Sequence, residues 1–320
     1  MPRPYGPQAS VQLTEDEVLA ATRSLYADRL KPYGRIILRR VGERACARSG
    51  ATSPPFICAR ELRALCEGSP RLLVRPEEAR EYSVVLVGAS SHPFVDPADK
   101  RDPYPQELWD GLAAHFAEGG AGHSEALPGS RYACAMALAE LDLACLRGLT
   151  LGEVNHVVAL AMGSRRVLGY NSGRAVPYHK SEAGIKMKCA ANAVPVPTGP
   201  DAPLGVASWE VVRAGLWELL SRAEKKGREM PLQNVKRLFR SEFGLSLSET
   251  ALGHQRLLDL LQDPRLHDVC ALRRREDVHQ RVVVQKAAST LATGAPPLAC
   301  PPGCPLLRTA PPAPPAQRPA

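Results

Sequence analysis

The sequence predicts a mainly helical α+β protein, built from tandem units of helices followed by short β-hairpins and ending in a disordered, proline-rich tail. Apolar residues recur at helical spacing over most of the chain and switch to the alternating spacing of strands only over short stretches. Only 5% of the 320 residues are aromatic and 30 are proline, which predicts small cores joined by irregular connections.

The first unit, residues 11–100, follows a flexible N-terminus of residues 1–10. Thr14 and Glu17 have the spacing of a capping box, so a helix begins here and ends near Leu30. Two more helices and a pair of strands are expected at residues 35–47, 59–66, 72–74 and 82–87. Three helices followed by a strand pair is the order of a winged helix.

The middle unit, residues 101–190, has the same order. Thr150 and Glu153 form a second capping box, and Asn171-Ser172-Gly173 tolerates the positive φ angles of a hairpin turn. The expected helices and strands lie at residues 105–117, 131–146, 151–162, 166–170 and 174–178.

A third unit, residues 208–286, follows a proline-rich linker of residues 191–207 and precedes the disordered tail of residues 287–320. Its helices and strands are expected at residues 208–226, 231–243, 249–262, 268–273 and 281–286. We hypothesise that the three winged-helix-like units are diverged copies of one pattern.

The chain has no signal-peptide pattern at its N-terminus and no apolar stretch of the ~20 residues that a membrane span needs. Nine cysteines, an odd number at irregular spacing, indicate reduced thiols. We therefore expect a cytoplasmic protein, with the nucleus possible and no membrane partner. The net charge of +8 weakly favours contact with phosphate or with an acidic partner.

The third unit resembles the LOTUS domain, also called OST-HTH. The residues that carry the resemblance are Met230-Pro231-Leu232, Leu238-Phe239, Glu242-Phe243-Gly244, Leu252-Gly253-His254, Leu257 and Leu260-Leu261. The preceding stretch from Leu149 to Tyr178 is similar to the region that accompanies such domains, the OST-HTH-associated domain. Where the family has an aromatic residue after the glycine, this chain has His254.

The resemblance implies a scaffold that binds RNA, in particular G-rich or G-quadruplex RNA. In an extended form such a domain docks a DEAD-box helicase within RNA granules. The nuclease domain that accompanies the family elsewhere has no counterpart in this sequence, because no run of alternating strands and helices carries an acidic cluster.

Basic residues of the third unit are the candidates for RNA contact. They lie on the second helix, on the third helix and on the strand pair: Lys236, Arg237, Arg240, Arg256, Arg273, Arg274, Arg275 and Arg281. Lys236 and Arg240 share one helix face, and a hairpin packed beside it would make a single phosphate-binding surface. The alternative is a set of solvated faces, with Glu242, Glu276 and Asp277 as counter-charges.

Other polar and aromatic features each have two interpretations. His254 has the spacing of a core histidine with a hydrogen-bond partner, which would preclude stacking on RNA. Trp209, Leu216 and Trp217 are candidate anchors for a protein partner, whereas Trp209, Leu216 and Leu220 fit a buried stripe equally well. A second nucleic-acid face or a solvated helix face is formed by Arg39, Arg40, Arg44 and Arg48.

The sequence gives no positive argument for catalysis. Cys300 and Cys304 lack the two further ligands that structural zinc requires, and no phosphate-cradling glycine motif or nucleophile–histidine motif occurs. We therefore predict a non-catalytic adaptor that binds G-rich or structured RNA, acts in RNA regulation or RNA granules, and uses no metal or cofactor. The alternative is a protein-interaction module that docks a DEAD-box helicase or another granule protein without binding RNA.

Overall fold

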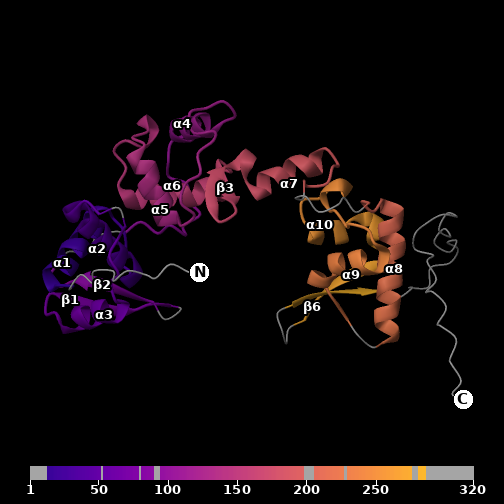
Figure 1. The fold of residues 1–320 in the computed structure, drawn as a ribbon, viewed down its shortest axis with the longest axis horizontal. Coiled ribbons are helices and arrows are strands. Elements are labelled where there is room, and N and C mark those ends of the chain that lie inside the picture. The colour runs from indigo at the N-terminus through magenta and orange to yellow at the C-terminus, as the bar shows by residue number, and fades with distance from the viewer. Residues whose placement is uncertain are drawn as a thin grey trace, which may run out of the picture. The chain divides into compact units, whose positions relative to one another are not determined.

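A computed structural model describes residues 13–51, 53–78, 81–89, 94–197, 205–226, 229–275 and 280–285. The fold is mainly helical with short antiparallel strand pairs, which confirms the predicted fold class (Figure 1). The predicted flexible N-terminus and proline-rich tail lie outside the described residues. The chain forms two compact bodies, Met1–Ser181 and Glu182–Ala320, so the first two predicted units share the N-terminal body.

The first half of the N-terminal body has the predicted order of three helices and a hairpin. Both hydrogen bonds of the Thr14–Glu17 capping box are present, and Leu13 packs in the same core as Val18. The first helix ends earlier than predicted, because Arg29 takes a positive φ of 56°. The elements are α1 (Glu15–Ala27), α2 (Gly34–Ser49), α3 (Ala59–Gly68), β1 (Leu72–Pro76) and β2 (Tyr82–Leu86).

The second half repeats this order. The predicted helix at residues 131–146 is shorter than expected: it ends at Glu140, because Asp142 has a φ of 46° and a separate 3-10 turn follows. The turn residues Ser172 and Gly173 both have positive φ, as predicted. The elements are α4 (Gln106–Phe116), α5 (Arg131–Glu140), η2 (Ala144–Leu146), α6 (Leu151–Met162), β3 (Leu168–Asn171), β4 (Arg174–Pro177) and η3 (Tyr178–Lys180).

The end of α1 and the start of α6 join the two halves. The Gly152 amide donates to the Asp28 carbonyl at 2.8 Å, and Arg29 pairs with Glu153 at 2.7 Å. A Cβ at position 152 would lie 2.7 Å from the Arg29 carbonyl oxygen, so only glycine permits this approach without movement. Glu153 therefore both completes the α6 capping box and holds the end of α1.

Arg40 of α2 forms a second, more buried link between the halves. Its Nε donates to the Tyr132 hydroxyl of α5 at 3.1 Å, and its Nη1 lies 2.6 Å from the Asp28 carboxylate. The Tyr132 hydroxyl in turn donates to Glu43 at 2.9 Å, and burial raises the pKa of Tyr132 to about 12. Figure 1 shows α5 and α6 beside the α1 and α2 pair.

We predict that Arg40→Met destabilises the N-terminal body. The change leaves the Asp28 carboxylate and the Tyr132 hydroxyl without their guanidinium partner, which costs about 1–3 kcal/mol. Arg44→Met on the exposed face of the same helix is the matched control and should change stability by less than about 0.5 kcal/mol. Differential scanning calorimetry measures both, and an equal effect of the two substitutions would contradict the link.

The C-terminal body begins with a helix that the sequence did not predict, α7 (Glu182–Ala191), which packs against η5 (Thr250–Leu252). The end of the predicted linker is also structured, because Ala207 is buried and its amide donates to the Ser246 carbonyl at 3.0 Å. The remaining elements are α8 (Trp209–Lys225), β5 (Met230–Pro231), η4 (Leu232–Asn234), α9 (Val235–Phe243), α10 (Leu257–Leu261), η6 (Pro264–Leu266), β6 (Cys270–Arg275) and β7 (Gln280–Gln285).

The helix predicted at residues 249–262 is shorter than expected. Instead of one helix over residues 249–262, the chain forms η5, breaks at Gly253 with a φ of 84°, and starts α10 at Leu257. The left-handed backbone at Gly253 ends the helical hydrogen-bond pattern. The strand pair gains a third member, since β5 pairs with β7 to give the order β5-β7-β6.

α8 and α9 cross closely at Gly215, where an added Cβ would lie 2.8 Å from the ring of Phe239. Phe239 is fully buried in the core of the C-terminal body, together with Leu216 and Leu260. Figure 1 shows α8 alongside α9 in this body. The glycine thus allows the aromatic side chains of α9 to pack against α8.

We predict that Phe239→Ala lowers the stability of the C-terminal body by about 3–5 kcal/mol, because it leaves a cavity in a closely packed core. The transition of the C-terminal body in calorimetry should move to lower temperature while that of the N-terminal body stays in place. Trp217→Ala, at an exposed position on α8, is the aromatic control and should have an effect within about 0.5 kcal/mol. A smaller loss of stability for Phe239→Ala than for Trp217→Ala would contradict the placement of Phe239 in this core.

Candidate nucleic-acid interface

Two arginines of α9 lie outside its apolar face. Val235, Phe239 and Phe243 recur every four residues and are buried, whereas Arg237 and Arg240 are exposed. Within the described part of the chain, neither arginine forms an ion pair with a carboxylate. Being three residues apart, the two guanidinium groups are neighbours on the helix surface.

Three other candidates for RNA contact have acidic partners. Lys236 pairs with Glu249, a buried carboxylate, and Arg273 lies 3.9 Å from Glu229. Arg256 holds Asp259 through two hydrogen bonds of 2.8 Å, which lower the pKa of that carboxyl group. These contacts offset the positive charge at three of the candidate positions.

The β6–β7 hairpin carries the remaining candidates. Arg274 is exposed, and the strand register places it directly opposite Arg281. The side chains of Arg275 and Arg281 lie outside the described part of the structure. Among the candidate residues whose side chains are described, Arg237, Arg240 and Arg274 are those without a carboxylate partner.

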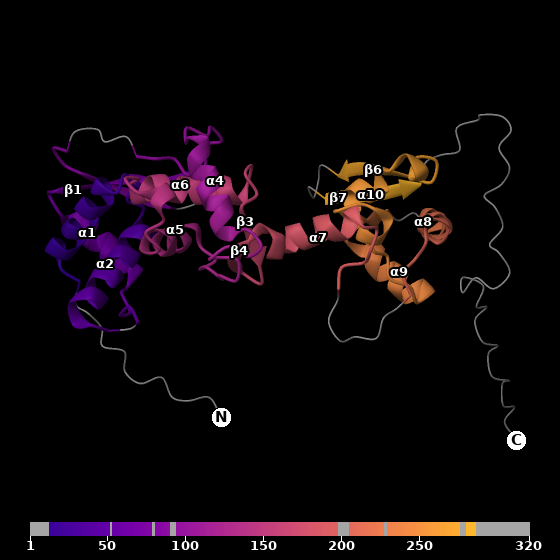
Figure 2. The ribbon, with the colours of Figure 1, turned by 90° about the horizontal axis from the view of Figure 1, so that it is seen from above.

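The structure does not bring the α9 group and the hairpin group together into one packed surface. α9 packs against α8 and η4, whereas β6 packs against α8 and α10. Figure 2 shows α9 and β6 on opposite sides of the C-terminal body. Among the described residues, β6 therefore does not pack beside the basic face of α9 as the sequence suggested, and the two elements lie on different sides of the body.

His254 has the partner that the sequence predicted for a core histidine. Its Nε2 lies 2.9 Å from the Asp263 carboxylate, and its ring stands edge-on to Trp209 at a centroid distance of 6.0 Å. The side chain is 22% exposed. The ring is therefore engaged within the protein and is not presented for stacking on RNA.

The candidate protein anchors on α8 divide between core and surface. Leu216 is fully buried and Trp209 packs against the same core, which confirms the buried-stripe interpretation for these two residues. Trp217 is 49% exposed and faces away from that core. Of these three residues, Trp217 is therefore the one that is available to a protein partner.

The arginines of α2 do not share one exposed face. Arg40 is buried in its network with Asp28 and Tyr132, so the predicted stripe is interrupted. Arg48 pairs with Glu17 at 2.5 Å, while Arg44 is exposed. The helix therefore does not present the continuous basic face that its sequence suggested.

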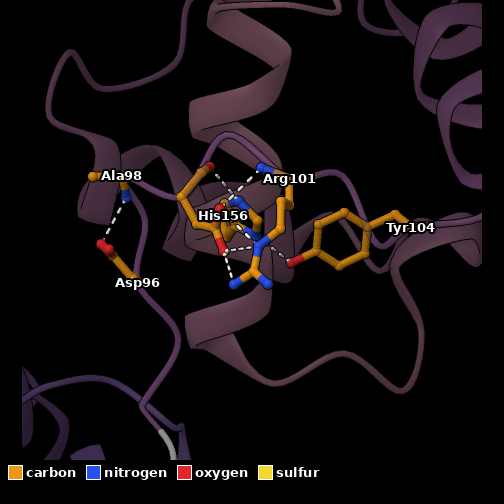
Figure 3. Close-up of polar contacts among 6 residues, drawn as sticks. Asp96, Ala98, Arg101, Tyr104 and His156 are labelled. Carbon is orange, nitrogen blue, oxygen red and sulfur yellow. Dashed lines mark hydrogen bonds and ion pairs between the residues drawn. The ribbon is translucent and has the colours of Figure 1, made fainter.

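A cluster of polar contacts in the N-terminal body centres on His156 of α6 (Figure 3). The ring is buried, with Nδ1 3.0 Å from the Tyr104 hydroxyl and Nε2 2.9 Å from the Asp99 carbonyl oxygen. Because a carbonyl only accepts, Nε2 donates the proton in that bond. Hydrogen bonds from Arg101 lower the pKa of Asp99 to about 2. Both ring nitrogens are used, so the cluster ties the 96–104 segment to α6.

Buried cysteines in both bodies are poorly suited to act as nucleophiles. All the cysteines that the structure describes are free thiols, and burial raises the pKa of Cys66 and Cys270 to about 11 and that of Cys134 to about 12. Cys300 and Cys304 lie outside the described residues. In the described ranges no group of three or more His, Cys, Asp or Glu side chains is arranged to hold a metal ion.

We predict that Cys134 reacts with iodoacetamide much more slowly than Cys58 at pH 8. The thiolate is the reactive form, and a raised pKa together with burial keeps Cys134 protonated and covered, whereas Cys58 is partly exposed. Mass spectrometry of the alkylated native protein measures both rates. Equal rates in the folded protein would show that Cys134 is accessible, and equal rates after denaturation are the control.

Residues 122–192 match the family model of the OST-HTH Associated domain. The matched segment includes α5, α6, the β3–β4 hairpin and α7. This confirms the resemblance predicted for the middle unit, although the match does not extend to residues 208–286, where the LOTUS domain stays a prediction. Searches of the curated proteins and of the solved structures gave no match. Among the described helices, none is long and apolar enough to span a bilayer.

Proposed function

We propose that this protein is a non-catalytic RNA-binding adaptor that binds G-rich or structured RNA, in the cytoplasm or the nucleus. The OST-HTH Associated domain supports an RNA-related role, since the family accompanies OST-HTH domains. The observation that carries the proposal is the pair of exposed arginines on α9, Arg237 and Arg240, which have no carboxylate partner within the described structure. Charges of this kind are free to contact phosphates.

The hairpin supports the same function from a second surface. Arg274 and Arg281 occupy directly opposite positions on β6 and β7. Arg274 is exposed and has no carboxylate partner within the described structure, so its side chain is available to a phosphate. A protein with two separate basic surfaces is better suited to bind a folded RNA, which can contact both surfaces, than to bind a ligand with a single phosphate group.

The second candidate function is a protein-interaction module that docks a DEAD-box helicase or another component of RNA granules. Trp217 supports it, because a half-exposed tryptophan on a helix surface is typical of interface hot spots. Salt distinguishes the two candidates. Phosphate contacts weaken steeply as salt rises, whereas an apolar contact centred on Trp217 changes little.

We predict that the full-length chain binds G-rich RNA and that the Arg237→Ala, Arg240→Ala double variant binds it more weakly. Each phosphate contact to a single strand contributes about 0.7 to the slope of log K against log salt, so the variant should lose about 1.4 from that slope. Fluorescence anisotropy against G-rich RNA, scrambled RNA and duplex DNA at several salt concentrations gives the affinity, the slope and the preference.

The matched control is the Arg23→Ala, Arg60→Ala double variant, which removes the same charge from exposed positions on α1 and α3. It should leave the slope unchanged. Absence of binding to all three nucleic acids would contradict the proposed function and favour the protein-interaction module. In that case Trp217→Ala should lower the affinity for the helicase in a pull-down that is insensitive to salt.

A further inference from the structure

The N-terminal body contains a cleft of about 580 Å³ at the junction of its two halves. Its walls are formed by the start of α2, the start of α5, α6 and the segment from Phe94 to Pro97. This volume lies within the range of roughly 300–1,000 Å³ that is usual for sites that bind one small molecule. The cleft belongs to a different body from the α9 arginines and does not depend on them.

Cationic side chains dominate the charge of the cleft. Its lining includes Lys31, Arg35, Arg39 and Arg131, against the single carboxylate of Asp96. Arg131 is exposed, and within the described structure it donates to the Pro97 carbonyl at 3.4 Å and pairs with no carboxylate. Arg39 donates to the Ser130 hydroxyl at 3.1 Å, so a guanidinium and a hydroxyl lie together at the start of α5. This end of the cleft suits a phosphate group.

Three of the four cations also have acidic partners at the rim. Lys31 lies 2.7 Å from Glu77, Arg39 lies 3.3 Å from Glu43, and the longer Arg35–Glu81 pair measures 3.6 Å. These are partly exposed pairs, which are weak and exchange readily for another anion. Arg131 therefore provides a positive charge that no described carboxylate offsets. Of the three paired cations, Arg35 has the longest ion pair and would leave its carboxylate most easily to bind an anionic ligand.

Aromatic rings line the same cleft. Tyr33 is half-buried and carries Lys31 and Arg35 beside its ring, at 5.1 and 5.4 Å from the centroid. Phe94 is half-buried and stands edge-on to Tyr26 at 4.9 Å. Rings of this kind provide stacking surfaces for a nucleobase, which every base can use because each has a π face.

Asn155 supplies a buried polar group without a partner. It is 8% exposed, lines the cleft from α6, and its Oδ1 has no hydrogen-bond partner. A buried acceptor that lacks a donor is costly, so a ligand that brings an N–H group is favoured at this position. Inorganic phosphate and carboxylates bring no such donor, whereas the amino and imino groups of nucleobases do.

We propose that this cleft binds one nucleotide, with its phosphate at Arg131 and Arg39, its base against Tyr33 and Phe94, and a base N–H donating to Asn155. The nucleotide is either a free mononucleotide or one residue of a single-stranded RNA. Both sources share the chemistry of a phosphate beside a planar base with polar edges.

The test is isothermal titration calorimetry of the full-length chain with AMP, GMP, CMP, UMP, a single-stranded tetranucleotide and inorganic phosphate. Saturable binding of a mononucleotide identifies the free nucleotide as the source. Binding of the tetranucleotide alone, retained in the α9 double variant, identifies RNA as the source. Phosphate binding as tight as that of every nucleotide, or no saturable binding of any nucleotide, overturns the proposal.

Two variants localise the binding. The Arg39→Ala, Arg131→Ala variant changes only exposed positions and should weaken nucleotide binding by about tenfold or more, since each charge-assisted bond contributes substantially to affinity. Asn155→Leu should weaken nucleotide binding while leaving phosphate binding unchanged. Arg44→Ala on α2 is a control that should bind every ligand as the wild type does, and the α9 double variant should bind the mononucleotides as the wild type does. Equal binding by all variants overturns the proposal.

Ultraviolet cross-linking of the wild-type chain to a 4-thiouridine nucleotide gives a readout that does not depend on a variant folding. Mass spectrometry should map the cross-link to peptides that contain Tyr33 or Phe94. Cross-links confined to the C-terminal body would overturn the cleft while leaving the proposed RNA binding by α9 intact. Loss of RNA binding in the α9 variant with mononucleotide binding retained would separate the two sites.

Discussion

The close approach of α6 to the end of α1 is the constraint on which the N-terminal body depends. A main-chain hydrogen bond from Gly152 to Asp28 holds the two helices end to end, and any side chain at position 152 would meet the Arg29 carbonyl. The same turn exposes Arg29 to Glu153 and fixes Asp28 beside Arg40. Two units that look separate along the sequence therefore form one body.

The cleft is a consequence of this junction. The start of α2 and the start of α5 face one another because Arg40 and Tyr132 bond across them. The segment at Val95 is held by its amide, which donates to the Arg29 carbonyl at 3.0 Å. Residues from four separate stretches thus surround one space, and Asn155 lies in its wall. The cleft is preformed only if this junction is stable, because the residues that line it come from stretches far apart in the sequence.

The C-terminal body uses one helix for two purposes. The buried face of α9 packs at Gly215 of α8, and Arg237 and Arg240 lie outside that face. Because the apolar side is held by a fully buried Phe239, the arginines are displayed on a rigid element. The hairpin carries its arginines on another side of the same body, so charge is distributed over two surfaces.

The sequence by itself determined the local features: both capping boxes, the turn at Ser172 and Gly173, the bounds of α6 and the buried stripe of α8. These depend on neighbouring residues, whose spacing is visible in the chain. The tertiary structure alone decided that Arg40 turns inward, that α7 packs with the C-terminal body and that helix and hairpin arginines separate. Asn155 illustrates the reason. The polar pair Asn155-His156 within an apolar helix was a visible signal, but the partners of His156 lie far away in sequence and Asn155 Oδ1 has none within the described structure, since only packing determines whether a buried polar group is satisfied.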